Sequence, residues 1–333
     1  MTKLTVVLIS KNQAWNVERL VESVLAGTEG AASREVVLVD SASTDETVQK
    51  ASRYPISVLR LREGQQLTPA AGRYVGYQHT EGDLILFLDG DMELHPGWLE
   101  GALQVLQDEP NVAAITGQVV DLPKAAGPDD DKPPLQAGDA NAVTEIPYGG
   151  GAAMYRRSVL QEVGTFNPYL HSDEEPEMCI RIRHAGYRIV RLQRPIAYHY
   201  TDPKGGLSTK VARWRRKLYL GAGQALRYHV GDEVFGSYVR ERGYGLIPAL
   251  GLLAGFISLL WALVSGRRAL VQAWTLGLGL VVAGDVFRKQ SLYRTACSLL
   301  ERLFIVDGTL RGFLIEPLDP SSYPCEFDFV KRG

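Results

Sequence analysis

Two aspartates stand one residue apart directly after an apolar run. The segment from Asp83 to Glu93 reads DLILFLDGDME, and its run at residues 84–88 predicts a fully buried strand of the parallel type. Ligands of open α/β sheets gather at the carboxyl ends of such strands, where Asp89 and Asp91 would lie. Two carboxylates so close in sequence offer hard oxygen ligands to Mg²⁺ or Mn²⁺, and Mg²⁺ usually binds one or two carboxylates together with substrate phosphates. The pattern therefore indicates a metal-bound diphosphate, and a solvated turn after the strand is the alternative.

A second group of acids precedes an amphipathic helix that we expect over residues 175–185. Asp173, Glu174 and Glu175 stand at its N-terminal end, where the helix dipole favours negative charge, so capping and catalysis are both open. Further along, residues 204–218 carry lysines and arginines with no acid between them. Such a stretch could neutralise a departing diphosphate, face anionic lipid headgroups, or form a solvated helix face.

Composition narrows the class of protein. The 333 residues hold 36 Lys+Arg against 38 Asp+Glu, a net charge of −2 that gives no support to a nucleic-acid binder. Cys179, Cys297 and Cys325 lie far apart with no C-x-x-C pair, which favours a reducing compartment and argues against a disulfide framework or a zinc site. The apolar run near the N-terminus is too short for a signal-peptide core and predicts a first strand.

The order of elements predicts βαβ units over the first 120 residues, because short apolar runs alternate with helical patterns. We expect strands at residues 4–9, 35–39, 56–61, 84–88 and 112–119, and helices at 15–26, 47–52, 69–79 and 96–107. Residues 121–147 are rich in proline and contain three consecutive aspartates, so they predict a segment without regular structure. It is either a mobile loop near the site or a surface tether.

The last third of the chain is strongly apolar. Residues 245–264 carry no charge and residues 269–284 form a second run, which together predict a helical hairpin in a membrane. Arg240, Arg242, Arg288 and Lys289 would place both ends on the cytoplasmic side. Arg267 and Arg268 in the turn oppose that orientation. A re-entrant or interfacial hairpin and a buried helix pair in an oligomer are the alternatives. The tail would be amphipathic, lying on the membrane surface or on the catalytic domain.

In this order the motifs resemble those of the family 2 glycosyltransferases, nucleotide-sugar-dependent enzymes of the GT-A fold. The resemblance covers roughly residues 3 to 201. Asn12 matches the last residue of the family's P-T-Y-N-type motif, and residues 39–45 (VDSASTD) resemble its V-D-D-G-S-T-D segment. Residues 72–76 (GRYVG) resemble A-R-N-x-G, Asp89-Gly-Asp91 is the D-x-D, and residues 174–181 (EEPEMCIR) align with E-D-x-D-L-x-x-R.

The resemblance implies an α/β fold, a Rossmann-like mixed sheet flanked by helices, to which we add the C-terminal α-helical membrane-associated region. It implies nucleotide-sugar contacts at Ser10, Asn12, Asp40, Arg73, Asp89 and Gly150. It implies metal ligands at Asp91, Asp89 and His199, and a catalytic base at Glu175 with Glu174 and Asp173 as rivals. Arg213 and Arg216 are the candidates for contact with the leaving phosphate.

Several positions depart from the family's pattern, among them Ile9 and Lys11, which replace the proline and the tyrosine of the first motif. Ser41 replaces the second aspartate of the nucleotide-binding motif, which leaves the base preference open. Tyr74 replaces the asparagine of the third motif, and Glu175 replaces the usual aspartate. Either carboxylate can take a hydroxyl proton if it reaches.

We therefore expect a catalytic domain at residues 1–203 with its loop at about 121–147. A basic helical connector at 204–242, an apolar hairpin at 243–287 and an amphipathic tail at 288–333 would follow.

The predicted function is inverting transfer of a sugar from a UDP- or GDP-type donor to a hydroxyl acceptor, with Mn²⁺ or Mg²⁺. It would serve synthesis of cell-surface polysaccharide, glycolipid or a lipid-linked intermediate at the cytoplasmic face of the membrane. A single base with no opposing carboxylate nucleophile implies direct displacement. The alternatives are a polyprenyl-phosphate glycosyltransferase and a non-catalytic nucleotide-sugar-binding subunit of a membrane synthase complex.

Overall fold

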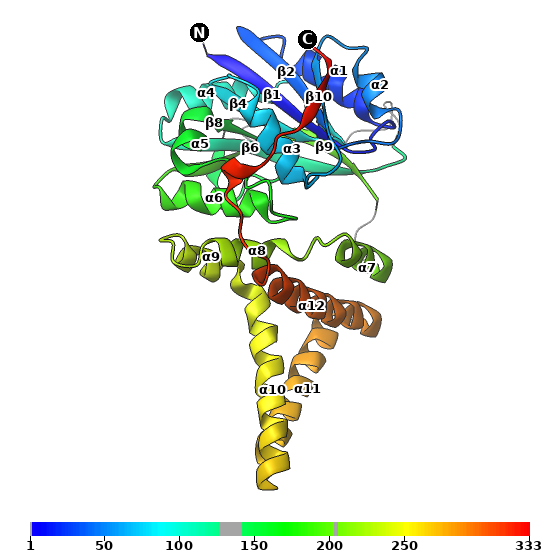
Figure 1. Ribbon diagram of the computed structural model, residues 1–333, viewed down its shortest axis with the longest axis vertical. Helices are drawn as coiled ribbons and strands as arrows, with labels where there is room; N and C mark the ends of the chain where they lie inside the picture. Colours follow the sequence, from blue (N-terminus) through cyan, green and yellow to red (C-terminus); the bar gives the residue numbers. More distant parts are fainter. Residues whose placement is uncertain (1, 127–141, 203–205) are drawn as a thin grey trace. The chain divides into compact units, whose positions relative to one another are not determined.

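Strands and helices alternate along the first 120 residues of the computed structural model, which describes residues 2–126, 142–202 and 206–333 (Figure 1). The strands expected there are β1 (Lys3–Ser10), β2 (Ser33–Asp40), β3 (Ser57–Leu61), β4 (Leu84–Asp89) and β6 (Val112–Pro123). The helices are α1 (Val17–Gly27), α2 (Thr47–Ala51), α3 (Pro69–Gln78) and α4 (Trp98–Asp108). The βαβ pattern that the sequence predicted is therefore confirmed.

In the parallel half of the sheet, three strands with polar last residues end on the same side. β3, β2, β1 and β4 are neighbours in that order and run parallel. Ser10 pairs with Asp40, and Ile9 pairs with Asp89, so the strands end at the same level. Ligands of such sheets bind outside the carboxyl ends of the strands.

The other half of the sheet is mixed. β8 (Ala153–Arg156) joins β4 and β6 antiparallel, and β9 (Arg188–Thr201) pairs parallel with β6. The short β5 (Met92–Leu94) pairs antiparallel with β9 and carries the chain past Asp91. β9 therefore reaches the side of the sheet on which β4 ends.

Helices cover both faces of the sheet. One apolar cluster joins α1 and α4 to the sheet through Leu20, Val24 and Trp98. A second cluster on the other face includes residues of α3, α5 (Arg157–Val163) and α6 (Glu174–His184). A mixed sheet between helical layers is the expected GT-A architecture, and α6 begins with the predicted acids.

The segment at residues 121–147 differs from its prediction at both ends. β6 continues through Pro123 because its pairing with β9 extends to Thr201, and a proline at a strand end removes no needed hydrogen bond. β7 (Val143–Glu145) pairs antiparallel with the middle of β9. The prediction of no regular structure was wrong for these residues. The rest of the proposed mobile loop, residues 127–141, lies outside the described residues.

The C-terminal residues also differ from their prediction. β10 (Phe327–Lys331) pairs antiparallel with β3 at the edge of the sheet, so residues 318–333 belong with residues 1–204 to one compact unit, which the sequence analysis expected to be the catalytic one. Tyr323 is buried there, donates to the carbonyl of Gln66 at 2.7 Å, and packs edge-on against Tyr74. The tail at 288–333 is thus not one amphipathic segment, because its last part forms a strand that pairs with the otherwise unpaired side of β3.

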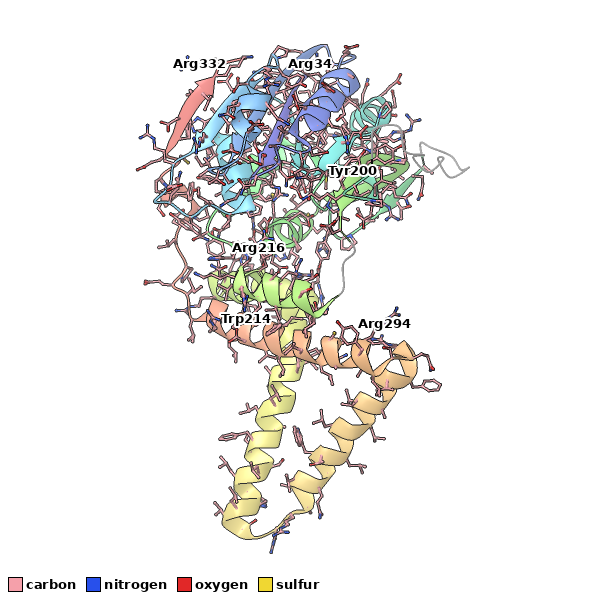
Figure 2. All side chains as sticks on the ribbon, turned by 90° about the vertical axis from the view of Figure 1, so that its right-hand side faces the viewer. Arg34, Tyr200, Trp214, Arg216, Arg294 and Arg332 are labelled. Atoms are coloured by element: carbon pink, nitrogen blue, oxygen red, sulfur yellow. The ribbon has the colours of Figure 1, made fainter. Side chains whose placement is uncertain are left out.

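Residues 205–317 form a second compact unit made of helices. It contains α7 (Leu207–Arg215), α8 (Gly221–Tyr228), α9 (Phe235–Arg242), the 3₁₀ turn η1 (Gly243–Gly245), α10 (Leu246–Ser265), α11 (Ala269–Lys289) and α12 (Leu292–Phe313). α10 and α11 are the predicted apolar pair, and both are long and apolar enough to cross a membrane. Their side chains point outward with little covering them (Figure 2).

The contacts between these helices are close. Trp274 of α11 lies against Gly255 of α10, where an added Cβ would meet the indole at 2.4 Å. The same indole donates to the carbonyl of Gly251 at 2.8 Å. α12 crosses the open end of the hairpin (Figure 1) and packs on α8, where Gly223 and Gly308 let the backbones approach closely.

Candidate active site

Hydrogen bonds from a buried side chain hold the turn between Asp89 and Asp91 in place. Asn16, which is buried at the start of α1, donates its amide to the carbonyls of Gly90 at 3.0 Å and Met92 at 2.9 Å. A Cβ at Gly90 would lie 2.8 Å from the side chain of Gln13. The sequence analysis did not single out Asn16, because nothing local connects it to residues 74 positions away.

Arg73 joins the first aspartate to the acids of α6. From the buried face of α3 its guanidinium lies 2.6 Å from Asp89 Oδ1 and 2.8 Å from Glu174 Oε1. Burial disfavours the charged guanidinium, but the carboxylates of Asp89 and Glu174 outweigh it and raise the pKa of Arg73. Burial raises the pKa of both Asp89 and Glu174, although Arg73 opposes the rise. The three side chains form one charged group, in which Arg73 is buried and the two carboxylates are partly buried.

A glycine turn lies against the same group. An added Cβ at Gly151 would lie 2.4 Å from Asp89 Oδ2, so Asp89 occupies the space of a side chain. Gly150 has φ +79°, in the left-handed region that glycine adopts without strain. The sequence analysis chose Gly150 for contact with the nucleotide sugar, whereas the close approach in the structure is made by Gly151.

Glu175 is held by the first glycine of that turn. Its Oε1 accepts the backbone N–H of Gly149 at 2.5 Å and lies 2.9 Å from Cys179 Sγ, one helical turn further along α6. Its side chain is nearly buried, and this burial raises its pKa against the hydrogen bonds from Cys179, Gly150 and Gly149. A carboxylate with a raised pKa binds a proton more readily, as a general base must.

His199 and Asp91 face each other across β9 and β5. His199 Nε2 lies 3.3 Å from Asp91 Oδ2, and the N–H of Tyr200 donates to the carbonyl of Asp91 at 2.8 Å. Two ligand atoms that bind one cation at about 2.1 Å, with a right angle between the two bonds, lie about 3 Å apart. The His199–Asp91 pair therefore fits two neighbouring ligands of Mg²⁺ or Mn²⁺. Within the described residues no three His, Cys, Asp or Glu side chains form a complete metal site. A diphosphate would have to supply the remaining ligands.

The candidates for nucleotide binding lie at the ends of β1 and β2. Asn12 has φ +55°, and its side-chain oxygen accepts the N–H of Thr44 at 2.8 Å. Asp40 is fully buried and accepts both the N–H and the hydroxyl of Ser43. Burial raises the pKa of Asp40 against those two hydrogen bonds. Direct contact of Asp40 with a nucleotide would require exchange of the Ser43 bonds.

Ser10, at the end of β1, is also buried. Its hydroxyl oxygen finds no hydrogen-bond partner in the parts of the chain that the structure describes. A buried hydroxyl without a partner is costly, so this oxygen is a polar group that a ligand at the sheet edge could satisfy.

Arg213 and Arg216 belong to the second unit. Arg213 lies on α7 with its guanidinium 5.8 Å from the ring centre of Tyr219, and Arg216 directly follows the helix. α7 is attached to α12, because Trp214 stacks on Phe304 and donates to Asp307 at 2.8 Å. The contact of these arginines with a leaving phosphate stays a prediction.

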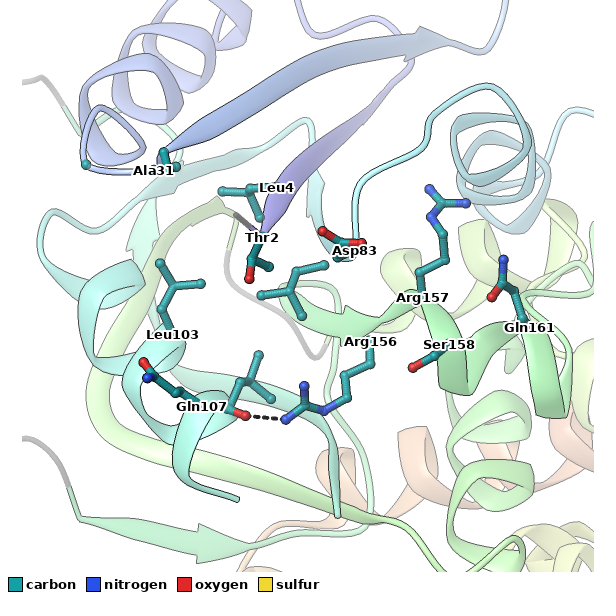
Figure 3. A pocket seen from close by; sticks show the side chains of 14 residues that line it. Thr2, Leu4, Ala31, Asp83, Leu103, Gln107, Arg156, Arg157, Ser158 and Gln161 are labelled. Carbon is teal, nitrogen blue, oxygen red and sulfur yellow. Dashed lines mark hydrogen bonds between the residues drawn. The ribbon is translucent and has the colours of Figure 1, made fainter. Parts of the chain in front are cut away.

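A hollow of about 690 Å³ lies at the opposite ends of the strands, near Leu4 and Leu84 (Figure 3). Two arginines line it. Arg156 donates to the carbonyl of Val112 at 2.7 Å, and Arg157 donates to the carbonyl of Gly82 at 2.6 Å. These guanidinium groups hold strand ends together, and Asp83 supplies a carboxylate to the lining of the hollow.

Comparison with known proteins agrees with this geometry. Residues 5–164 match the family described as Glycosyl transferase family 2, a range that includes Arg73, Asp89 and Asp91. This range of the chain is similar to a family 2 glycosyltransferase domain. The match ends before Glu175 and His199, whose roles therefore rest on the geometry above.

Curated relatives of this chain carry glycosyltransferase names. It is 29% identical over 285 residues to the pre-mycofactocin glycosyltransferase of Mycobacterium tuberculosis, which covers 80% of this chain and 57% of that protein. It is 26% identical over 239 residues to the glycosyltransferase AglE of Haloferax volcanii, covering 63% of this chain and 71% of that protein. The chain thus spans little more than half the length of the mycobacterial relative.

Solved structures share its GT-A fold. The mannosyltransferase PcManGT from Pyrobaculum calidifontis, in complex with GDP-Man and Mn²⁺, has a TM-score of 0.60 at 19% identity, covering 94% of this chain and 87% of that one. S. aureus TarS 1–349, in complex with UDP-GlcNAc, has a TM-score of 0.51 at 17% identity, covering 93% and 90%. Both likenesses extend beyond the catalytic unit and support the fold.

Proposed function

We propose that this enzyme transfers a sugar from a nucleoside-diphosphate sugar to a hydroxyl acceptor with inversion, and that Glu175 is the base. The observation that supports this best is the meeting of Glu175, Asp89 and the Asp91–His199 pair at one edge of the sheet. An acceptor hydroxyl is a weak nucleophile, so a carboxylate must accept its proton as the new bond forms. No second carboxylate is assigned as a nucleophile, which favours direct displacement.

The contacts of the rival acids support Glu175. Glu174 is paired with Arg73 at 2.8 Å, and proton uptake there would weaken that buried ion pair. Asp173 precedes the helix with φ +66°. Glu175 accepts from the Gly149 backbone and has a pKa raised by burial, which orients the carboxylate and strengthens its affinity for a proton.

We infer that Asp91 and His199 would hold a divalent cation, Mn²⁺ or Mg²⁺, together with the diphosphate of the donor. Such a cation supplies Lewis-acid stabilisation of the negative charge that develops on the leaving diphosphate. Asp89 is bound to Arg73 and lies against Gly151, so we assign it to the donor's ribose or sugar rather than to the cation. Ser10, Asn12 and Asp40 would line the nucleoside end.

The nucleotide of the donor is UDP or GDP in this proposal. PcManGT was solved with GDP-Man and TarS with UDP-GlcNAc, so both nucleotides occur on this fold. Ser41 replaces the second aspartate of the family's motif, which leaves the choice between the two nucleotides open.

We further propose that α10 and α11 insert into a membrane and hold the enzyme at its cytoplasmic face. α10 has 20 residues, and at 1.5 Å per residue it reaches about 30 Å, the thickness of a bilayer's hydrocarbon core. Its apolar side chains are exposed, among them Ile247, Leu250 and Leu263. The acceptor would then be a growing cell-surface polysaccharide, a glycolipid or a lipid-linked intermediate.

Two other functions were open from the sequence. The relatives are named as glycosyltransferases, which favours an enzyme over a non-catalytic subunit. A polyprenyl-phosphate acceptor is already anionic and needs no strong base, so the acids at the start of α6 argue against it.

The test is a panel of UDP- and GDP-sugars with Mn²⁺, using detergent-solubilised full-length protein and a lipid extract. Release of nucleoside diphosphate should fall about 10²–10⁴-fold in Glu175→Gln, the usual contribution of a general base. It should also fall strongly in Asp91→Asn. Turnover that survives both substitutions would reject the proposed roles. Transfer to polyprenyl phosphate in preference to hydroxyl acceptors would favour the second candidate.

A further inference from the structure

We propose that Asp121 is a positioning residue that orients His199 for the divalent cation. His199 Nδ1 lies 2.6 Å from Asp121 Oδ1, while its other ring nitrogen faces Asp91 at 3.3 Å. The inference rests on the proposed function, because it assumes that His199 is a ligand of the cation. It adds a residue to which neither the family's motifs nor the sequence analysis gave a role.

The sheet places these three side chains in a row. Asp121 is the direct register partner of His199 in the parallel pairing of β6 with β9. Met92, next to Asp91, is the register partner of His199 in the antiparallel pairing of β5 with β9. His199 therefore lies between the carboxylate of Asp121 on β6 and that of Asp91, which directly precedes β5. Because strand pairing determines both contacts, the backbone on both sides of β9 fixes the position of the imidazole.

The order of the contacts determines which nitrogen can bind a metal. A short contact between Nδ1 and a carboxylate, which only accepts hydrogen bonds, places a proton on Nδ1. In the neutral imidazole Nε2 then carries a lone pair, and it points at the carboxylate of Asp91. Two acceptors facing each other at 3.3 Å repel unless a proton or a metal cation lies between them. Asp121 thus selects the tautomer in which Nε2 is the ligand, the arrangement found in carboxylate–histidine–metal sites.

The experiment measures Mn²⁺ binding by electron paramagnetic resonance on the full-length protein in detergent, with UDP or GDP present. Loss of such an orienting carboxylate typically weakens metal affinity by about 10–100-fold, and we expect this for Asp121→Ala. Asp83→Ala is the matched control, since Asp83 is an acid at the opposite edge of the same sheet. Its Mn²⁺ affinity should equal that of the wild type.

A double-mutant cycle separates positioning from direct ligation. His199→Ala alone should weaken Mn²⁺ binding, and adding Asp121→Ala should then have no further effect. A further loss in the double variant would mean that Asp121 binds the cation itself, which would overturn the inference. An unchanged affinity in Asp121→Ala, with a loss in His199→Ala, would overturn it too and leave the proposed function standing. An unchanged Mn²⁺ affinity in His199→Ala would reject His199 as a metal ligand in the proposed function. It would also reject the present inference, which depends on that role.

Discussion

The guanidinium of Arg73 lies 2.6 Å from the carboxylate of Asp89, and this ion pair connects α3 to the end of β4. The arginine side chain is 5% exposed and that of Asp89 is 33% exposed, so water reaches the pair only from the side of the aspartate. The same guanidinium also holds Glu174, the neighbour of the proposed base. Arg73 thereby determines the spacing between the D-x-D turn and the start of α6.

Arg73→Met should destabilise the catalytic unit strongly. Removing one partner of a buried ion pair leaves uncompensated charge and costs about 3–5 kcal/mol. The melting temperature of the full-length protein in detergent should fall by roughly 10 °C, at about 2–4 °C per kcal/mol. Arg62→Met is the control, because Arg62 pairs with Asp328 on the surface and its loss should leave the melting temperature nearly unchanged. Equal losses in the two variants would contradict the buried role of Arg73.

Glu175→Gln should stabilise the protein increasingly as pH rises. Burial raises the pKa of Glu175 in the folded state above its unfolded value. Its contribution to stability is therefore full below the unfolded pKa and is lost as pH rises through the folded pKa. Glutamine does not titrate, so the melting temperature of the variant minus that of the wild type should grow from about pH 4.5 upward. A difference that is constant across this range would contradict the prediction.

Glu35→Gln provides a control with the opposite sign. Burial favours the neutral acid there, but hydrogen bonds from Lys3, Glu81 and Thr5 outweigh it and lower the pKa of Glu35. Its stabilisation is present above the unfolded pKa and is lost as pH falls through the folded pKa. Glu35→Gln should thus destabilise the protein at neutral pH, and its effect should shrink in acid.

Gly151→Ala should reduce turnover without a comparable loss of stability. The added Cβ would lie 2.4 Å from Asp89 Oδ2, so Asp89 or the glycine turn must shift. Small displacements of groups that position substrate cost up to about 10²-fold in rate, and we expect a loss of about 10–100-fold in kcat/KM. Gly30→Ala is the control, since a Cβ there meets no atom within 4 Å. Normal rates in Gly151→Ala would show that Asp89 need not lie so close to the turn.

Phe256→Arg should weaken membrane attachment. Phe256 lies near the middle of α10 with 58% of its surface exposed, and an arginine at a helix centre costs about 2.5–3.5 kcal/mol of insertion. A larger share of the variant should leave the membrane fraction in an alkaline carbonate wash. Val230→Arg, at an exposed apolar residue outside the hairpin, should remain bound like the wild type. Release of both variants, or of neither, would argue against insertion of the hairpin.

Local patterns in the sequence determined which chemistry to expect. The apolar run that ends at Asp89 and Asp91 predicts a strand and a polar turn, and the structure has both, because burial on two faces of a sheet requires such a run. The uncharged run after residue 245 likewise predicted an apolar helix, since about twenty residues of one kind suffice for it. These features depend on neighbours in the chain.

Only the tertiary structure decided which distant groups meet. The pairing of Arg73 with Glu174 joins residues 101 positions apart, and that of His199 with Asp121 joins residues 78 apart. The pairing of β10 with β3 spans more than 250 residues and is not visible in any local pattern. Strand order sets these contacts, because neighbours across a sheet are chosen by the whole fold and not by adjacent residues.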